Sequence, residues 1–167
     1  MRGTRGCAAP NQTSRILMKA IVYREYGSPD GLELRDIDKP EIGDEEVMIH
    51  VRAAGLDRGL WHVMTGLPYP IHLAGYGLRA PDNPVLGSDV AGVVEAVSKD
   101  VSRFQPGDEV FGIGKGSYAE YACAREDKLA HKPANLTFEQ AAVLAISGLT
   151  ALQALRDHGR VEPGLKC

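Results

Sequence analysis

The sequence is poor in the features that mark membrane, disulfide-linked and nucleic-acid-binding proteins. Its longest apolar run lies around residues 141–146, far short of the roughly 20 residues that a membrane-spanning helix needs, so we predict no membrane association. Its three cysteines, Cys7, Cys123 and Cys167, contain no C-x-x-C pair, which argues against zinc or redox motifs and favours a cytoplasmic location. A net charge of −3 provides no basic surface for nucleic acid.

The chain of 167 residues has the size of one ordinary domain, and its first half contains short segments with strand periodicity. In the segment 46–53, Val47, Ile49 and Val51 alternate with other residues and would share one face. Clusters of Gly, Pro, Ser and Asp between the segments predict turns. Strands this closely spaced favour an all-β sandwich or barrel. The first predicted strands are 20–23, 32–35 and 46–53.

The stretch 84–112 dominates the middle of the chain. Gly92 interrupts an apolar run at 90–97 and predicts a bulge or a close approach of two backbones, because glycine otherwise weakens a strand. Pro-Gly-Asp at 106–108 predicts a turn into a second apolar strand. The glycine-rich segment 112–117 lacks the spacing of a phosphate loop, so we predict a flexible turn between strands. Further strands are expected at 117–124 and 128–132.

Two helical segments are predicted near the end of the chain. Residues 137–140, Thr-Phe-Glu-Gln, have the T-x-x-Q pattern of a capping box. We expect Ser147-Gly148 to interrupt the helix, and a second helical run to stop at Gly159. The first helix would turn inward Ala141, Ala142, Leu144 and Ala145. The second run carries Leu149, Leu152 and Leu155.

Two other regions show no periodicity. Residues 66–84 are rich in Pro and Gly and predict a long loop, in which Tyr69 and Tyr76 either line a substrate pocket or anchor a surface excursion. Residues 1–17 hold three arginines and no acid, and they predict a disordered tail, with a transit peptide as the alternative. The expected organisation is a disordered N-terminal tail at 1–17, a domain at 18–158 and the start of a linker at 159–167.

Several of these segments occur in the order found in one enzyme superfamily. The pattern Gly87-Ser88-Asp89-x-x-Gly92-x-Val94, then Gly107-Asp108-x-Val110, resembles the N-terminal, GroES-like catalytic domain of medium-chain dehydrogenases/reductases, in the zinc-free quinone oxidoreductase branch. The resemblance implies a mainly β fold with a few helices, a GroES-like partly open β-barrel, with the relatives' Rossmann domain missing from this chain. It also implies that a full-length relative is a homodimer. Further matching motifs are Met18-Lys19-Ala20, residues 54–66, Ala119-Glu120-Tyr121 and residues 147–151.

The resemblance bears on metal binding. Zinc alcohol dehydrogenases of the superfamily have a cysteine ligand at the position of Asp57 and His-Glu at the position of Ser88-Asp89. Because zinc prefers thiolate and imidazole ligands, and no four-cysteine loop is present, we predict neither catalytic nor structural zinc. A site made by Asp57, His62 and Asp89 would match known metal preferences poorly.

The predicted loss of zinc decides the expected chemistry. Oxidation of an alcohol needs a metal or another device that lowers the pKa of its hydroxyl, whereas an electrophilic carbonyl can accept hydride with only hydrogen bonds to stabilise the developing charge. We therefore predict an NAD(P)H-dependent oxidoreductase that transfers hydride to a quinone or an α,β-unsaturated carbonyl. NADPH is the expected cofactor, with NADH as the alternative, and the isolated chain is expected to be inactive.

The resemblance also assigns roles to individual residues. His62 would donate the proton that follows hydride, or is an exposed or capping histidine. Arg58 would contact the cofactor pyrophosphate, or is a solvated charge, and Thr150 would approach the nicotinamide, or bonds its own helix backbone. Asp57 stands where zinc-free relatives commonly have Asn. The predicted site comprises His62 and Asp57 as catalytic residues, Arg58, Ser88 and Thr150 at the cofactor, and Trp61, Tyr69 and Tyr76 at the substrate.

Two other interpretations stay open at this point. The chain is a truncated, catalytically inactive β-barrel module in one of them, and an alcohol dehydrogenase with altered metal ligands in the other. Neither the substrate nor the oligomeric state follows from the sequence.

Overall fold

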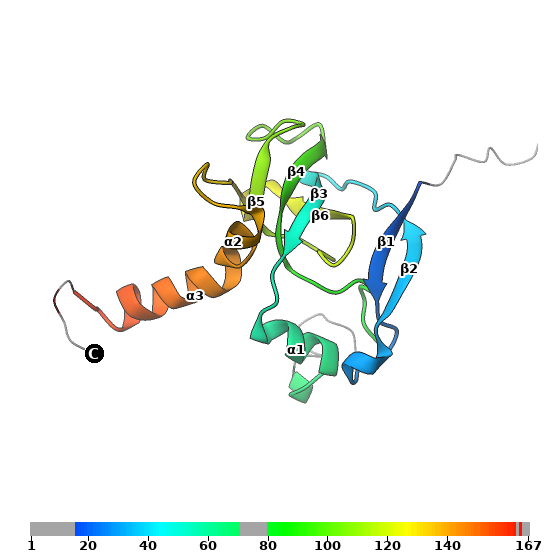
Figure 1. Cartoon of the computed structure of the whole chain (residues 1–167), viewed down its shortest axis with the longest axis horizontal. Coiled ribbons are helices and arrows are strands. Elements are labelled where there is room, and N and C mark those ends of the chain that lie inside the picture. Colours follow the sequence, from blue (N-terminus) through cyan, green and yellow to red (C-terminus); the bar gives the residue numbers. More distant parts are fainter. Residues whose placement is uncertain (1–15, 71–79, 163, 165–167) are drawn as a thin grey trace, which may run out of the picture.

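The computed structural model describes residues 16–70, 80–162 and 164, which form a mainly β domain with a curled, partly open barrel (Figure 1). Five strands form an antiparallel sheet in the order β6-β3-β4-β5-β7, and β1 pairs with β2 in a separate ribbon. The predicted fold class is confirmed. The strands are β1 (Leu17–Val22), β2 (Glu33–Asp38), β3 (Glu46–Ala54), β4 (Asp89–Val97), β5 (Glu109–Ile113), β6 (Tyr121–Arg125) and β7 (Leu129–His131).

The strands agree with the predicted positions except at their ends. β1 begins at Leu17, one residue before the expected start of the domain. The strand expected at 117–124 begins only at Tyr121, because the residues before it pair elsewhere. The N–H of Ser117 donates to the Gly87 carbonyl at 3.2 Å, and Ala119 bridges to Ala20 in the β1–β2 ribbon. This crossing segment therefore joins the ribbon to the rest of the barrel.

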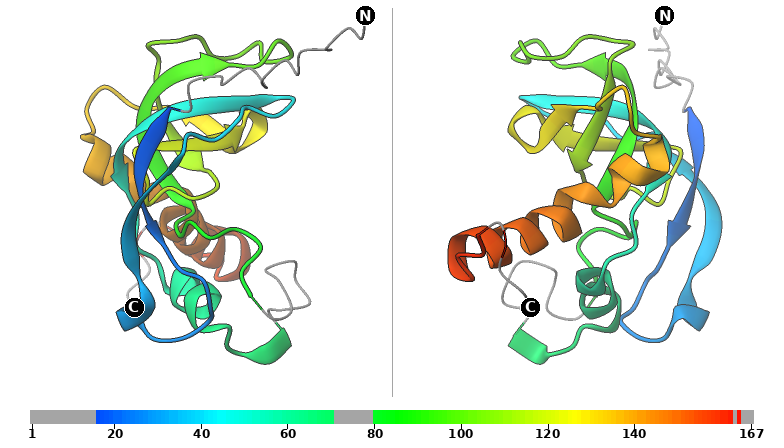
Figure 2. Two further views of the ribbon diagram at one scale, coloured as in Figure 1. Left: turned by 90° about the vertical axis from the view of Figure 1, so that its right-hand side faces the viewer. Right: turned by 60° about the vertical axis from the view of Figure 1, so that its left-hand side comes forward.

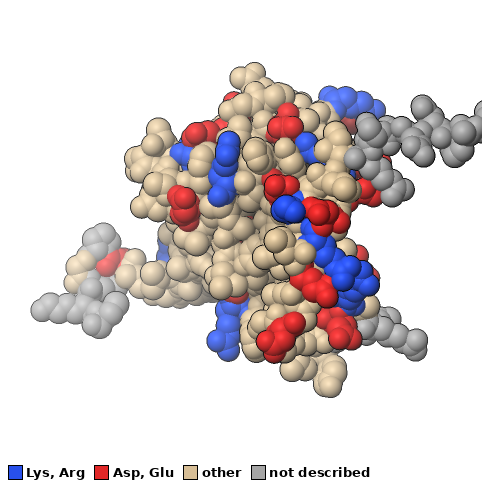
Figure 3. All heavy atoms as spheres, turned by 45° about the vertical axis from the view of Figure 1, so that its right-hand side comes forward, with Lys and Arg blue, Asp and Glu red and all other residues tan. Residues whose placement is uncertain are grey.

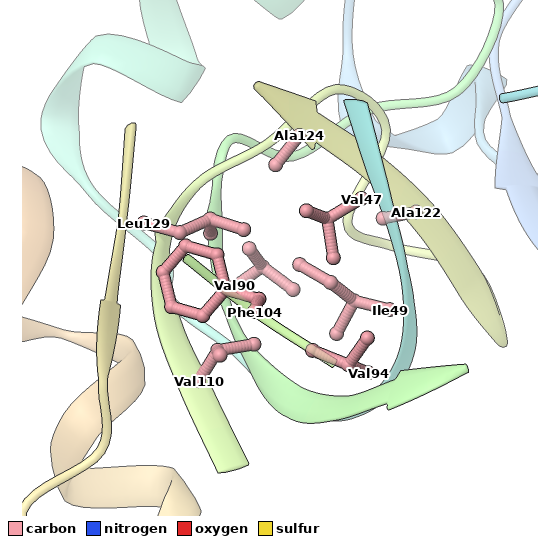
Figure 4. Close-up of a cluster of buried hydrophobic side chains, with 9 residues drawn as sticks. All are labelled: Val47, Ile49, Val90, Val94, Phe104, Val110, Ala122, Ala124 and Leu129. Carbon is pink, nitrogen blue, oxygen red and sulfur yellow. The ribbon is translucent and has the colours of Figure 1, made fainter. Parts of the chain in front are cut away.

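The hydrophobic core lies inside the curl of the five-stranded sheet (Figure 4). Alternation along β3 places Val47 and Ile49 inward, where both are fully buried, as their periodicity predicted. Each such side chain stabilises the fold by about 1.5–3 kcal/mol through removal of apolar surface from water. The cluster consists of Val47, Ile49, Val90, Val94, Phe104, Val110, Ala122, Ala124 and Leu129.

Gly92 lies where two strand backbones come very close, as predicted. It pairs with Val51 on β3, and the register shifts on both sides of this pair. A Cβ at position 92 would lie only 2.2 Å from the carbonyl oxygen of His50. The sharply curled region of the sheet therefore depends on a residue without a side chain.

The C-terminal helical segment begins as predicted but does not break at Ser147-Gly148. Thr137 and Gln140 form the reciprocal capping box, and Gly148 has ordinary helical angles (φ −66°, ψ −44°). The chain changes to wider π-helical turns rather than breaking, and the helix ends at Gly159 as expected. The successive elements are α2 (Phe138–Ala142), the π-helical η4 (Leu144–Gly148), α3 (Leu149–Leu152) and the π-helical η5 (Gln153–His158).

The inward face of this segment is narrower than predicted. Ala141, Ala142 and Ala145 are buried, but Leu144 is 38% exposed, because only the small alanines fit against the sheet. Figures 1 and 2 show that the segment starts against the sheet and then extends away from it. The leucines beyond residue 148 are accordingly about half exposed, namely Leu149, Leu152 and Leu155.

Helix α1 (Arg58–Thr65) was not predicted as a helix and lies near the turn that joins β1 to β2 (Figures 1 and 2). Two short 3₁₀ turns complete the described elements, η1 (Pro29–Gly31) and η3 (Glu126–Lys128). In the described part of the chain, no helix combines the length and apolar character needed to cross a membrane. On the face shown in Figure 3, acidic and basic side chains are intermingled.

Candidate functional site

The candidate site is built around the start of α1. Asp57 is the N-cap of this helix, and its Oδ1 accepts a hydrogen bond from the Leu60 N–H at 3.1 Å. Gly66 ends the helix in the left-handed conformation (φ 68°), which glycine adopts without a steric penalty. Leu60 and Met64, one turn apart, pack the helix against Tyr23 and Leu86. The helix therefore has a fixed position beside the barrel, with its first residues facing a cavity.

This cavity has a volume of about 650 Å³, within the range typical of small-molecule sites. Three predicted site residues line it together, Asp57, Arg58 and Trp61. Among the described residues, Arg58 has no ion-pair partner, so its guanidinium is available to an anionic ligand. The other lining residues are mainly apolar, namely Pro29, Leu32, Leu56, Leu60, Met64, Leu86 and Tyr118.

Tyr118 is the polar lining residue that the sequence reasoning missed. Its hydroxyl donates to the carbonyl oxygen of Gly55 at 3.2 Å. Burial, together with the negative charges of Asp57 and Asp89, raises the pKa of the Tyr118 phenol, so the side chain stays protonated at neutral pH. The sequence feature that could have indicated Tyr118 is the family motif Ala119-Glu120-Tyr121, which begins at the next residue.

Asp89 lies beside this site as a fully buried acid, 1% exposed. Its Oδ1 accepts a hydrogen bond from the Ile146 N–H at 3.1 Å, and no donor from the described residues reaches Oδ2. The pKa of Asp89 is raised to about 6, mainly by burial; the bond from Ile146 lowers it and the charge of Asp57 contributes to the rise. The sequence feature that indicates a buried acid here is a single Asp at the start of an otherwise apolar strand.

The remaining predicted residues do not line the cavity. The Nδ1 of His62 lies 2.8 Å from the Leu67 carbonyl, so this nitrogen must carry a proton and donate it. Thr150 Oγ1 donates to the Ile146 carbonyl at 2.7 Å, the backbone contact that was the alternative to its cofactor role. Ser88 is half-buried immediately before β4, and Tyr69 is 77% exposed. Tyr76 lies outside the described residues.

Metal-binding side chains are dispersed in this structure. Within residues 16–70 and 80–162, no three His, Cys, Asp or Glu side chains gather closely enough to hold a metal ion. Asp57 uses one carboxylate oxygen as a helix cap, and His62 uses one ring nitrogen on a carbonyl. The two side chains are thus committed to local backbone contacts.

The strand order, the capped α1 and the adjoining cavity define a GroES-like catalytic domain of the alcohol dehydrogenase type. Residues 43–134 match the family described as "Alcohol dehydrogenase GroES-like domain", and the chain belongs to this family. Within it, the chain is a quinone-oxidoreductase-like medium-chain dehydrogenase/reductase. The sequence resemblance is confirmed.

Individual relatives support this placement. The chain is 41% identical over 151 residues to a quinone oxidoreductase of Pseudomonas aeruginosa, a match that covers 89% of this chain and 43% of the relative. The quinone oxidoreductase structure from Coxiella burnetii superposes with a TM-score of 0.78 at 34% identity, covering 89% of this chain and 47% of that one. The Escherichia coli quinone oxidoreductase complexed with NADPH gives 0.75 at 27% identity, covering 87% and 42%. The chain thus spans less than half the length of these relatives.

Proposed function

We propose that this chain forms the substrate-binding part of an NADPH-dependent oxidoreductase that delivers hydride to a quinone or an α,β-unsaturated carbonyl without zinc. The observation that carries the proposal is the mainly apolar cavity at the start of α1, in a chain whose relatives are quinone oxidoreductases. A flat conjugated ring would bury its faces against Trp61 and the leucines, while its carbonyl oxygen would need a polar partner.

The side chains that line the cavity suit a quinone or an α,β-unsaturated carbonyl as the substrate that accepts hydride. Tyr118 keeps its proton at neutral pH and stands at the cavity wall as a neutral donor. Asp57 is held as a helix cap, where the N-terminal end of a helix stabilises negative charge. We propose that Tyr118 orients the substrate carbonyl by turning its hydroxyl proton from the Gly55 carbonyl to the substrate oxygen. Asp57 accepts hydrogen bonds only and fixes the start of α1 beside the substrate, and His62 supplies a proton from outside the cavity wall.

The residues that would hold NADPH, which supplies the hydride when bound, are Arg58, Ser88 and Thr150. Of these, Arg58 fits best, because its unpaired, exposed guanidinium matches the bidentate geometry of a phosphate group. Ser88 is half-buried and Thr150 already donates to its own helix. We propose that this chain by itself does not turn over NADPH.

Trp61 provides a direct test of the substrate site, because it is the single tryptophan of the chain and lines the cavity. We expect 1,4-naphthoquinone to quench its fluorescence with a saturable dependence on concentration, and cyclohexanone, which is not conjugated, to bind more weakly. Leu56→Arg should weaken quinone binding at least about tenfold, equivalent to 1.4 kcal/mol, by placing a charge at the cavity wall.

Leu34→Arg is the matched control, since Leu34 is exposed to a similar degree as Leu56 (68% against 79%) but lies on β2 away from this cavity. Quenching that does not saturate, or that both arginine variants weaken equally, would overturn the substrate site. In a parallel assay with the same quinone, the chain should leave NADPH absorbance unchanged; steady oxidation would contradict the proposal that this chain by itself does not turn over NADPH.

A further inference from the structure

The strongest feature outside the cavity is the contact between Asp89 and the C-terminal helical segment. Asp89 is the first residue of β4, is 1% exposed, and forms no ion pair with any described lysine or arginine. An ionised carboxylate in this position would be costly, because burial without a compensating charge disfavours the charged form.

The hydrogen bond of Asp89 interrupts the helical ladder. In a regular α-helix the N–H of Ile146 would donate to the carbonyl of Ala142, four residues earlier. Here it donates to Asp89 Oδ1 at 3.1 Å, and the chain changes at this point from α2 to the π-helical η4. Insertion of a side chain into the ladder is an established cause of such distortion.

Two further oxygen atoms, Asp89 Oδ2 and the Ala142 carbonyl oxygen, lie close to Gly55. A Cβ at this glycine would lie 2.6 Å from the Ala142 carbonyl oxygen and 3.0 Å from Asp89 Oδ2. Both oxygens therefore border the space that a side chain at position 55 would fill. Oδ2 is buried and accepts no hydrogen bond from the described residues, so it is satisfied either by carrying a proton that it donates or by a water molecule in this space.

We propose that Asp89 acts as a proton-dependent latch, a neutral carboxylic acid whose Oδ1 accepts from the Ile146 N–H while its Oδ2–H donates to the Ala142 carbonyl. A carboxylic acid has one acceptor and one donor in the geometry that the interrupted turn requires. When Asp89 loses its proton, the bond from Ile146 remains, but Oδ2 repels the Ala142 carbonyl and the junction between β4 and the helix loosens.

The surroundings of Asp89 support a proton held in mildly acidic solution, well above the usual pKa of an aspartate. Asp57, in the loop before α1, is the charged side chain that acts on Asp89, and it favours the neutral form, as does burial. Tyr118, on the segment after β5, is a phenol on which Asp89 acts in turn. The helical segment contributes only the N–H of Ile146. This inference does not depend on the proposed function, because it concerns the attachment of the helix.

Asparagine is the matched probe, because its side chain carries the acceptor and the donor permanently. We expect Asp89→Asn to melt at a higher temperature than the unmodified chain, by more at pH 8 than at pH 5, because the native carboxylic acid has lost its proton at pH 8. Asp89→Ala should melt lower at both values, since it leaves the Ile146 N–H without its acceptor, and at pH 5 it also removes the proposed bond to the Ala142 carbonyl. Asp100→Asn, at an exposed position, controls for the loss of one negative charge.

Two local measurements identify the proton itself. The infrared spectrum at pH 5 should show the C=O stretch of a buried carboxylic acid that disappears in Asp89→Asn. Hydrogen exchange at Ile146, corrected for the intrinsic pH dependence, should be slower at pH 5 than at pH 8 in the unmodified chain and independent of pH in Asp89→Asn. A missing infrared band, or an Asn variant as unstable as the Ala variant at pH 8, would overturn the latch and point to an ionised carboxylate bridged by water.

Discussion

Gly92 shows how much of the barrel depends on the absence of one side chain. A Cβ there would lie 2.2 Å from the His50 carbonyl oxygen and 2.8 Å from Ile49 Cγ2, and neither the strand backbone nor a buried side chain can move freely. We expect Gly92→Ala to lower the free energy of unfolding by at least about 2–3 kcal/mol, the upper range for overpacking a core. Urea denaturation followed by circular dichroism measures the change.

Gly27→Ala is the control for this experiment, because no atom of the described residues beyond its chain neighbours lies within 4 Å of the position that its Cβ would take. It should be neutral or slightly stabilising, since alanine restricts the unfolded chain. Equal stability of the two variants would show that β3 and β4 can separate at this point without cost. The prediction from sequence rested on the same fact, an isolated glycine inside an apolar run.

Helix α1 depends on its N-cap, and the same residue faces the cavity. Removing a capping carboxylate costs about 1 kcal/mol, so Asp57→Ala should lower the free energy of unfolding by about that amount. Asp57→Asn keeps an oxygen that can accept the Leu60 N–H and should be close to neutral. Thermal unfolding of both variants separates the cap from the charge, and an Asn variant as unstable as the Ala variant would contradict the capping role.

The cap of α1 could have been read from the sequence. Asp57 precedes Leu60 and Met64, which are one helical turn apart, and Gly66 follows; together they form the start, the apolar face and the end of a short helix. The family resemblance predicted a functional site at these residues, and no helix was predicted from their spacing. The π-helical turns after α2 had no such signal, because the side chain that distorts the ladder comes from β4, 57 residues away.

The stability of the whole domain should depend on pH through two buried acids with opposite effects. Glu46 loses contact with water, which raises its pKa, but hydrogen bonds from Lys115 and the Gly43 N–H outweigh this and leave it lowered from 4.5. Its stabilisation is present above about pH 4.5 and is lost on further acidification. The pKa of Asp89 is raised from 3.8 to about 6. The neutral form of Asp89 therefore stabilises the fold fully below about pH 3.8, the pKa in the unfolded chain, and this stabilisation is lost as the pH rises from there through 6.

These two effects predict a maximum of stability in mildly acidic solution rather than at neutral pH. Free energies of unfolding from urea titrations between pH 3 and 8 should rise from the acid side to about pH 4 and then fall, mainly between about pH 4 and 6. The fall should amount to about 2–3 kcal/mol, since one pKa unit corresponds to 1.36 kcal/mol. Glu46→Gln should flatten the acid side only, and a curve that rises steadily to pH 8 would contradict the assignment of Asp89.

The local patterns of the chain were sufficient for the mainly β fold, the capped start of α2, the inward face of β3 and the close backbone approach at Gly92. Period-two alternation, glycine in an apolar run and the T-x-x-Q pattern each act over a few residues, so neighbouring positions carry the information. The motif order was sufficient for the family and for three residues of the cavity, Asp57, Arg58 and Trp61.

Only the folded chain decided the rest. Tyr118, Leu86 and Leu32 reach the cavity from separate segments, and His62 and Thr150 turn to backbone carbonyls instead. The protonation of Asp89 depends on the helix that covers it and on the space left by Gly55. Packing between distant segments determines which side chains are desolvated and which hydrogen bonds they form. The periodicity of a single segment does not indicate which distant side chain will cover it or bond to it.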